Sequence, residues 1–156
     1  VTLRNLDFQI QENHIKKGIT KIKSIARLQE IKSGKLKDLC KNNKIFVDGS
    51  HNPLGAKVLN KYLNNFNCNK HIILGMMANK NHQEYMSYFK NISSLTTVDI
   101  PNQTNAIKGI ELKNKFPKAQ FRSSIQEAIN KLNLQENDIV LITGSLYLAG
   151  EVLNLN

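Results

Sequence analysis

The most informative stretch of the chain is Lys44–Pro53, which has the sequence KIFVDGSHNP. It begins with a short apolar run, Ile45–Val47, of the residue types that favour a buried strand in an α/β sheet. It ends in a helix start, because Asn52 is a good N-cap and Pro53 needs no N–H at the first helical position. The stretch therefore predicts a strand, a polar turn and a helix over about residues 53–66.

The predicted turn holds three polar side chains, Asp48, Ser50 and His51. They lie between the carboxyl end of a strand and the positive end of a helix dipole, where open α/β sheets hold nucleotides and anions. Two interpretations remain open at this point. The turn is a ligand site, or Asp48 and Asn52 only cap the helix while His51 is exposed.

The rest of the chain alternates between predicted strands and helices. The further strand candidates are residues 71–74, 95–99, 119–121 and 139–143, and a helix is predicted over Ser124–Leu134. A polar, lysine-rich segment, residues 32–43, predicts a surface loop. The alternation indicates an α/β fold with a Rossmann-like, wound, mostly parallel sheet flanked by helices.

Parallel strands bring their carboxyl ends to one edge of a sheet. We therefore expect the turn after the first strand, residues 48–52, to meet residues 75–81 and the pair Gly144-Ser145. The loop 101–104 also follows a strand and is expected at the same edge. Ser145 stands at a predicted helix N-terminus, where a hydroxyl and backbone N–H groups can hold a carboxylate. A plain N-cap serine is the alternative.

Composition indicates one domain that folds without disulfides or metal, since 156 residues at 40% hydrophobic can bury a real core. Cys40 and Cys68 have no CxxC spacing, so we expect reduced thiols in a cytoplasmic protein. No apolar run approaches the ~20 residues of a membrane span. The histidines His14, His71 and His82 lack metal-ligand spacing and are expected at the surface or at strand ends, so no metal site is predicted.

The chain carries 22 basic and 12 acidic residues, a net charge of +10. Such a balance raises the question of a nucleic acid or an acidic membrane surface. The lysines are scattered among asparagines, however, and the aromatic residues do not alternate with them as stacking platforms would, so we expect neither partner. A denser group of lysines lies on a predicted helix, Gln11–Lys23, whose buried side is expected to carry Ile15, Ile19 and Ile22.

The segment Asp48–Pro53 resembles the Asp-x-Ala-His-Asn-Pro motif of the Mur ligase superfamily C-terminal domain, in its folylpolyglutamate synthase/dihydrofolate synthase branch. Three more segments resemble family motifs in family order. These are the linker motif at Ala26–Gln29, a strand and Gly-x-x-x-Asp-Lys-Asp at Ile72–Asn81, and the closing strand with its Gly-Ser turn at Ile139–Leu148. The resemblance implies a C-terminal domain over residues 27–156, preceded over residues 1–26 by the end of a central-domain helix and an interdomain linker.

The resemblance implies ATP-dependent amide formation between L-glutamate and the carboxylate of a folate or dihydropteroate, through an acyl phosphate. The resemblance implies that Arg27 binds the ATP phosphates and that Asp48 binds the ribose hydroxyls of the nucleotide. His51 is expected in a catalytic role, orienting the phosphates or the neighbouring backbone. Ser145 is expected to bind the carboxylate of the incoming glutamate.

The sequence contains no G-x-x-x-x-G-K-[ST] loop, which the family keeps with its Mg²⁺ ligands in a central ATPase domain. That domain is absent here, so the chain is expected to need it in cis or in trans. Ile25 and Ala26 replace the proline and glycine of the family linker, and Asn79 and Asn81 replace two acids. The alternative to a working ligase domain is a non-catalytic, degenerate remnant.

Overall fold

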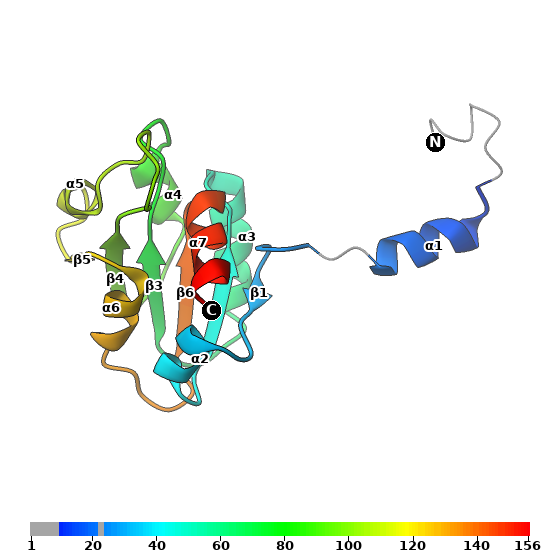
Figure 1. The fold of residues 1–156 in the computed structure, drawn as a ribbon, viewed down its shortest axis with the longest axis horizontal. Helices are drawn as coiled ribbons and strands as arrows, with labels where there is room; N and C mark the ends of the chain where they lie inside the picture. The colour runs from blue at the N-terminus through cyan, green and yellow to red at the C-terminus, as the bar shows by residue number, and fades with distance from the viewer. Residues whose placement is uncertain (1–9, 22–23) are drawn as a thin grey trace.

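The computed structural model describes residues 10–21 and 24–156 (Figure 1). Its central sheet contains β1 (Gln29–Glu30), β2 (Lys44–Asp48), β3 (Lys70–Leu74), β4 (Ser94–Val98), β5 (Gln120–Arg122) and β6 (Ile139–Thr143). The strands lie in the order β1-β2-β6-β3-β4-β5, and every neighbouring pair is parallel except β1 with β2. The predicted Rossmann-like, mostly parallel sheet is confirmed, and each predicted strand is present to within one residue at either end.

Helices flank the sheet on both faces. The flanking helices are α2 (Lys35–Cys40), α3 (Pro53–Leu63), α4 (His82–Ser87), α5 (Gly109–Asn114), α6 (Ile125–Asn130) and α7 (Leu146–Leu155). A further helix, α1 (Glu12–Lys21), lies away from the sheet. The helices α2, α6 and α7 pack on one face, and α3, α4 and α5 pack on the other (Figure 1). The domain therefore has three layers, with the sheet in the middle.

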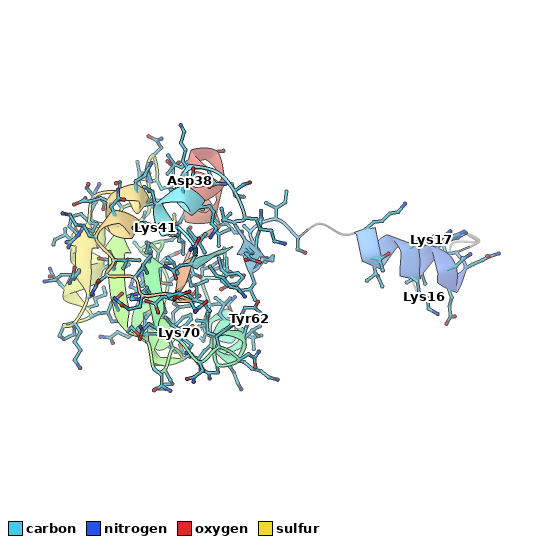
Figure 2. The ribbon with its side chains drawn as sticks, turned by 90° about the horizontal axis from the view of Figure 1, so that it is seen from below. Lys16, Lys17, Asp38, Lys41, Tyr62 and Lys70 are labelled. Atoms are coloured by element: carbon cyan, nitrogen blue, oxygen red, sulfur yellow. The ribbon has the colours of Figure 1, made fainter. Side chains whose placement is uncertain are left out.

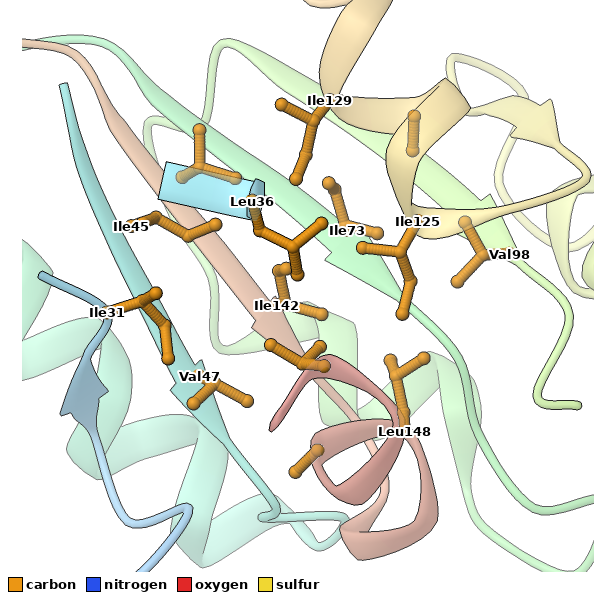
Figure 3. Packing of buried hydrophobic residues seen from close by; sticks show 14 of the residues in the cluster. Ile31, Leu36, Ile45, Val47, Ile73, Val98, Ile125, Ile129, Ile142 and Leu148 are labelled. Carbon is orange, nitrogen blue, oxygen red and sulfur yellow. The ribbon is translucent and has the colours of Figure 1, made fainter. Parts of the chain in front are cut away.

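The strands are apolar on both sides because each side meets a helix layer. In β2, Ile45 and Val47 join the core under α2 and α7, while Phe46 joins the core under α3 and α4. Figure 3 shows the first of these cores, in which Leu36 and Leu148 lie over the sheet. The central strand β6 is buried along its whole length.

The prediction of a surface loop over residues 32–43 is wrong. This segment contains α2, whose Leu36 and Cys40 are fully buried against the sheet. Leu36, Leu39 and Cys40 have the i, i+3, i+4 spacing of an apolar helix face, which the surrounding lysines hide in the average composition. Burial also raises the pKa of the Cys40 thiol to about 11.

Two predicted helices end earlier than expected. α3 stops at Leu63, yet Phe66 still packs on Tyr62 with ring centroids 5.3 Å apart. α6 begins after its N-cap Ser124 and ends at Asn130, while Leu132 packs against the core from outside the helix. Apolar residues in the loops after the helices continue the periodicity, so the pattern overestimates helix length.

The helix α1 lies within the predicted range, but its predicted buried side is wrong. Ile15 is 41% exposed and Ile19 is 63% exposed, while Ile22 lies outside the described residues. Figure 2 shows Lys16 and Lys17 on this helix, which stands away from the sheet. Periodicity predicts an apolar stripe but not whether a partner covers it. None of the helices in residues 10–21 and 24–156 has the length and apolarity needed to cross a membrane.

A buried polar cluster joins the amino ends of three strands. The Asp138 carboxylate, 1% exposed, accepts hydrogen bonds from the Gln135 N–H at 2.7 Å and from His71 Nε2 at 3.2 Å. The other nitrogen of His71 lies 2.8 Å from the Ser94 hydroxyl. His71 is near a strand end as predicted, but it is buried. Burial acts to raise the pKa of Asp138, and hydrogen bonds from Gln135, His71 and Asn69 outweigh it and hold the pKa below its ordinary value.

Replacing Asp138 by asparagine should destabilise the domain by about 1–3 kcal/mol at neutral pH, because it weakens hydrogen bonds to a buried charge. The lowered pKa means that the ionised carboxylate stabilises the fold above its unfolded pKa, and this contribution is lost as the pH falls through the folded pKa. Urea unfolding at pH 7 and below pH 4 tests this. We expect a smaller loss of stability on acidification in Asp138→Asn than in wild type, and equal losses would contradict the assignment.

Candidate functional site

The loops that follow β2, β3, β4 and β6 meet at the carboxyl edge of the sheet. The N–H of Gly75 donates to the Thr143 carbonyl at 3.2 Å, which joins the loops after β3 and β6. The N–H of Ala78 donates to the Asn105 carbonyl at 2.9 Å, which joins the loops after β3 and β4. The convergence that the sequence predicts for this edge is therefore present, including the loop after β4.

A cavity of about 570 Å³ opens between these loops. Its lining residues come from the loops after β2, β3 and β4 and from the start of α7: His51, Met77, Ala78, Asn79, Lys80, Thr104, Asn105, Ser145, Leu146 and Tyr147. Among these described lining residues, Lys80 carries the only full charge and no carboxylate is present. A cavity lined by one cation and otherwise by uncharged polar and apolar residues favours an anionic ligand.

Ser145 lies at the junction between the cavity and α7. Its hydroxyl oxygen accepts from the Tyr147 N–H at 3.1 Å and caps the helix. The residue also lines the cavity, although it is only 2% exposed. A hydroxyl that accepts one hydrogen bond still has a proton to donate. The two interpretations of Ser145, cap and ligand contact, are thus compatible.

His51 lines the cavity from the loop after β2. Its Nδ1 lies 3.2 Å from the Gly49 carbonyl oxygen. Because a carbonyl can only accept, Nδ1 is the protonated nitrogen of this pair, and Nε2 is left as the acceptor of a neutral ring. His51 is partly buried.

Asp48 is 5% exposed, and backbone N–H groups engage both its carboxylate oxygens. Oδ2 accepts from the Leu28 N–H at 2.6 Å, and Oδ1 accepts from the Ser50 N–H at 2.7 Å. The Gly49 N–H adds a bond of 2.8 Å to the Ala26 carbonyl. This carboxylate therefore fastens the segment before β1 to the turn after β2.

The fastened segment carries Arg27, whose side chain is exposed. Its neighbours Ala26 and Leu28 have φ values of 55° and 47°, in the left-handed region that favours glycine. The family linker has a glycine where this chain has Ala26, which agrees with a requirement for a positive φ at that position. Arg27 and Asp48 lie together beside β2 and are not among the residues that line the cavity.

Three lining or supporting residues gave no clear sequence signal. Lys80 lies within the motif at Ile72–Asn81, but the sequence did not distinguish it from the many other lysines. His82, predicted at the surface or a strand end, is buried at the start of α4, and its Nε2 donates to the Met77 carbonyl at 3.0 Å. The Tyr85 hydroxyl bonds to the Ser50 carbonyl at 3.1 Å, whereas an aromatic residue on a helix predicts only core packing.

The two asparagines that replace family acids have different environments. Asn81 caps α4, accepting from the Glu84 N–H at 3.2 Å and donating to the Glu84 carboxylate at 2.8 Å. Asparagine and aspartate are equally good N-caps, so this replacement preserves the local structure. Asn79 lines the cavity, where its replacement of an acid leaves the charge of Lys80 unopposed.

Comparison with known proteins gives one family and a set of similar structures. The model of the Mur ligase family, glutamate ligase domain, matches residues 27–146. A search of curated proteins found no significant match.

Solved structures with the same fold include the following three. Mycobacterium tuberculosis folylpolyglutamate synthase complexed with ADP and AMPPCP has a TM-score of 0.76 at 19% identity, covering 94% of this chain and 35% of that one. E. coli FolC in complex with DHPP and ADP has a TM-score of 0.79 at 18% identity, covering 97% and 36%. The bifunctional folylpolyglutamate synthase/dihydrofolate synthase of Yersinia pestis with Mn, AMPPNP and L-glutamate bound has a TM-score of 0.78 at 15% identity, covering 97% and 36%. This chain thus spans about a third of the length of each.

Gly144 sets the path of the chain from β6 into the cavity wall, and replacing it by alanine should destabilise the domain by about 1–3 kcal/mol. Its φ is 110°, and an added Cβ would lie 2.7 Å from the Gly75 carbonyl oxygen. The matched control is Gly150→Ala in α7, where an added Cβ meets nothing within 4 Å. That change should stabilise by up to about 1 kcal/mol. Urea unfolding measures both, and equal effects would contradict the constraint at Gly144.

Proposed function

This chain belongs to the Mur ligase family through its glutamate ligase domain, and on that premise we propose that it is the C-terminal domain of an ATP-dependent folate-glutamate ligase. The reaction would join L-glutamate to the carboxylate of a folate or dihydropteroate. The chain would act with a central ATPase domain, in cis or in trans. Support comes from the family match and from the fold shared with folylpolyglutamate synthase and dihydrofolate synthase structures, each nearly three times as long as this chain.

The observation that carries this proposal is the convergence of His51 and Ser145 on one cavity. They come from loops far apart in the sequence, and Lys80 completes the lining with a single positive charge. L-Glutamate has two carboxylates and one ammonium group, so its net charge of −1 complements that of Lys80. The first-turn N–H groups of α7 add partial positive charge at the same wall.

The lining residues have separate proposed roles. Lys80 and the Ser145 hydroxyl would bind a glutamate carboxylate through charge-assisted hydrogen bonds. His51 would be the catalytic residue. With Nδ1 held by the Gly49 carbonyl, its Nε2 is the acceptor that would orient the glutamate ammonium group and take from it the proton whose loss frees the nitrogen lone pair. The amine would then attack the acyl phosphate, and the C–O bond to phosphate would break as the nitrogen loses its second proton to the solvent or to the leaving phosphate.

The nucleotide side is proposed at the neighbouring cluster beside β2. Arg27 offers an exposed, planar set of donors suited to phosphates. Each oxygen of Asp48 has a second lone pair beyond its backbone bond, so the buried carboxylate would reach ribose hydroxyls only at its exposed edge while it holds the Arg27 segment in place. ATP would supply the activation of the folate carboxylate.

A magnesium ion fits this half of the site only through the nucleotide. Among the described residues, no group of three or more His, Cys, Asp and Glu side chains is placed to hold a metal ion. The ion would therefore be bound by the ATP phosphates and by the ATPase domain, since Mg²⁺ commonly takes one or two carboxylates together with substrate phosphates and water.

Replacing Lys80 by alanine should weaken L-glutamate binding about tenfold to a hundredfold, because a charge-assisted hydrogen bond contributes about 1.5–3 kcal/mol. Calorimetric titration of the purified chain measures this, with amide shifts of His51 and Ser145 as the local readout. The control Lys57→Ala removes an exposed lysine of α3 and should leave the affinity unchanged. L-Lysine, similar in size but cationic, should not bind.

A second experiment tests catalysis. Supplying a separately purified P-loop ATPase domain of a folate-glutamate ligase should produce glutamate addition that depends on Mg²⁺ and ATP, and His51→Ala should abolish it. Absence of both glutamate binding and reconstituted activity would reject the ligase role, and the degenerate remnant would take its place.

A further inference from the structure

Tyr85 is the largest fully buried side chain of the domain as described, and it reaches from α4 to the carboxyl edge of the sheet. Its ring packs in the core under α3 and α4, with its centroid 5.5 Å from that of Phe89. Its hydroxyl lies 3.1 Å from the Ser50 carbonyl oxygen and 2.8 Å from the Thr143 hydroxyl. One oxygen atom therefore contacts both β2–α3 and β6–α7 junctions.

The direction of these bonds follows from the number of protons. The phenol has one proton, and a carbonyl only accepts, so Tyr85 donates to Ser50 and Thr143 donates to Tyr85. The Ser50 hydroxyl also lies 3.4 Å from the Tyr85 oxygen. Burial raises the pKa of Tyr85 to about 12, although the contacts with the Ser50 and Thr143 hydroxyls act to lower it. The hydroxyl thus stays protonated throughout the neutral range.

Ser50 is held at both polar groups of its backbone by side chains. Its N–H donates to Asp48 Oδ1 at 2.7 Å, and its carbonyl accepts from Tyr85. The next residue is His51. In the neighbouring strand β6, Thr143 stands two residues before Ser145. His51 is therefore one residue from Ser50, and Ser145 is two residues from Thr143. Both Ser50 and Thr143 are hydrogen-bonded to the Tyr85 hydroxyl.

We propose that Tyr85 is a positioning residue, whose buried hydroxyl sets the placement of His51 relative to Ser145 in the cavity wall. Tyr85 is not among the residues that line the cavity, so it acts through Ser50 and Thr143 and not by touching the ligand. The significance of this placement for glutamate rests on the proposed function. The placement itself is a property of the domain without ligand.

The test variant is Tyr85→Phe, which keeps the ring and its packing on Phe89 and removes only the oxygen. The matched control is Tyr88→Phe at the end of the same helix, where the side chain is partly buried and packs against the same core. Both variants should remain folded by far-UV circular dichroism and show cooperative urea unfolding. If Tyr85→Phe does not fold, Thr143→Val replaces it as the test variant, because it removes the partner hydroxyl and keeps the side-chain shape.

The first readout needs no ligand. In ¹H–¹⁵N spectra, Tyr85→Phe should shift the amide signals of both His51 and Ser145, while Tyr88→Phe should shift neither. Thr143→Val should shift the same two amide signals as Tyr85→Phe does. Thr143→Ser keeps the hydroxyl and should leave the two signals at their wild-type positions. The double variant Tyr85→Phe/Thr143→Val should show little further shift beyond that of Tyr85→Phe alone. Unchanged His51 and Ser145 signals in Tyr85→Phe would overturn the proposal.

The second readout separates this proposal from the ligase function. We expect Tyr85→Phe to weaken L-glutamate binding about fivefold to twentyfold although every lining residue is intact, and Tyr88→Phe to bind as wild type does. Equal affinity of Tyr85→Phe and wild type would overturn the positioning role. If wild type itself does not bind glutamate, the proposed function fails, and the ligand-free amide shifts still decide whether Tyr85 positions the two loops.

Discussion

The parallel register of β2, β6 and β3 is the constraint on which the site depends. Asp48 lies opposite Thr143, and Thr143 lies opposite Leu74, so the three strands end at the same level. Their residues are buried by helices on both faces, and a slip of one residue would turn every apolar side chain toward the wrong layer. Burial of the strands thus determines the register, and the register aligns the residues at which the three polar loops begin, independently of any polar contact.

Polar contacts then refine what the register brings together. Asp48 and Tyr85 hold the two backbone groups of Ser50, and the carbonyl of Gly49 orients the ring of His51. These partners are backbone groups or buried side chains, which lose little conformational freedom on forming their bonds. The cavity wall is therefore supported from the core side, and its lining residues remain available to the solvent side.

The sequence predicted the features that local chemistry determines. The strands, the N-cap at Asn52 and the meeting of His51 with Ser145 follow from apolar runs, turn residues and the rule for parallel sheets. Three features depend on how segments far apart in the chain do or do not pack together, and the sequence did not predict them. They are the burial of α2 under a lysine-rich composition, the exposure of α1, and the bond between Tyr85 and Ser50. The sequence also did not predict that backbone N–H groups engage both oxygens of Asp48.

One of the many lysines differs from the others in its surroundings. A net charge of +10 spread over the surface has little effect at any one point, because salt screens exposed charges beyond about 10 Å. Lys80 differs because it lines a cavity that it shares with Asn79, and the acid that would neutralise it in the family motif is missing. Replacing that acid by asparagine removes a carboxylate that could bind a metal ion, and it also leaves the positive potential of Lys80 free to attract the carboxylate of a ligand. The replacement that first suggested a degenerate domain is thus electrostatically consistent with a cavity for an anionic amino acid.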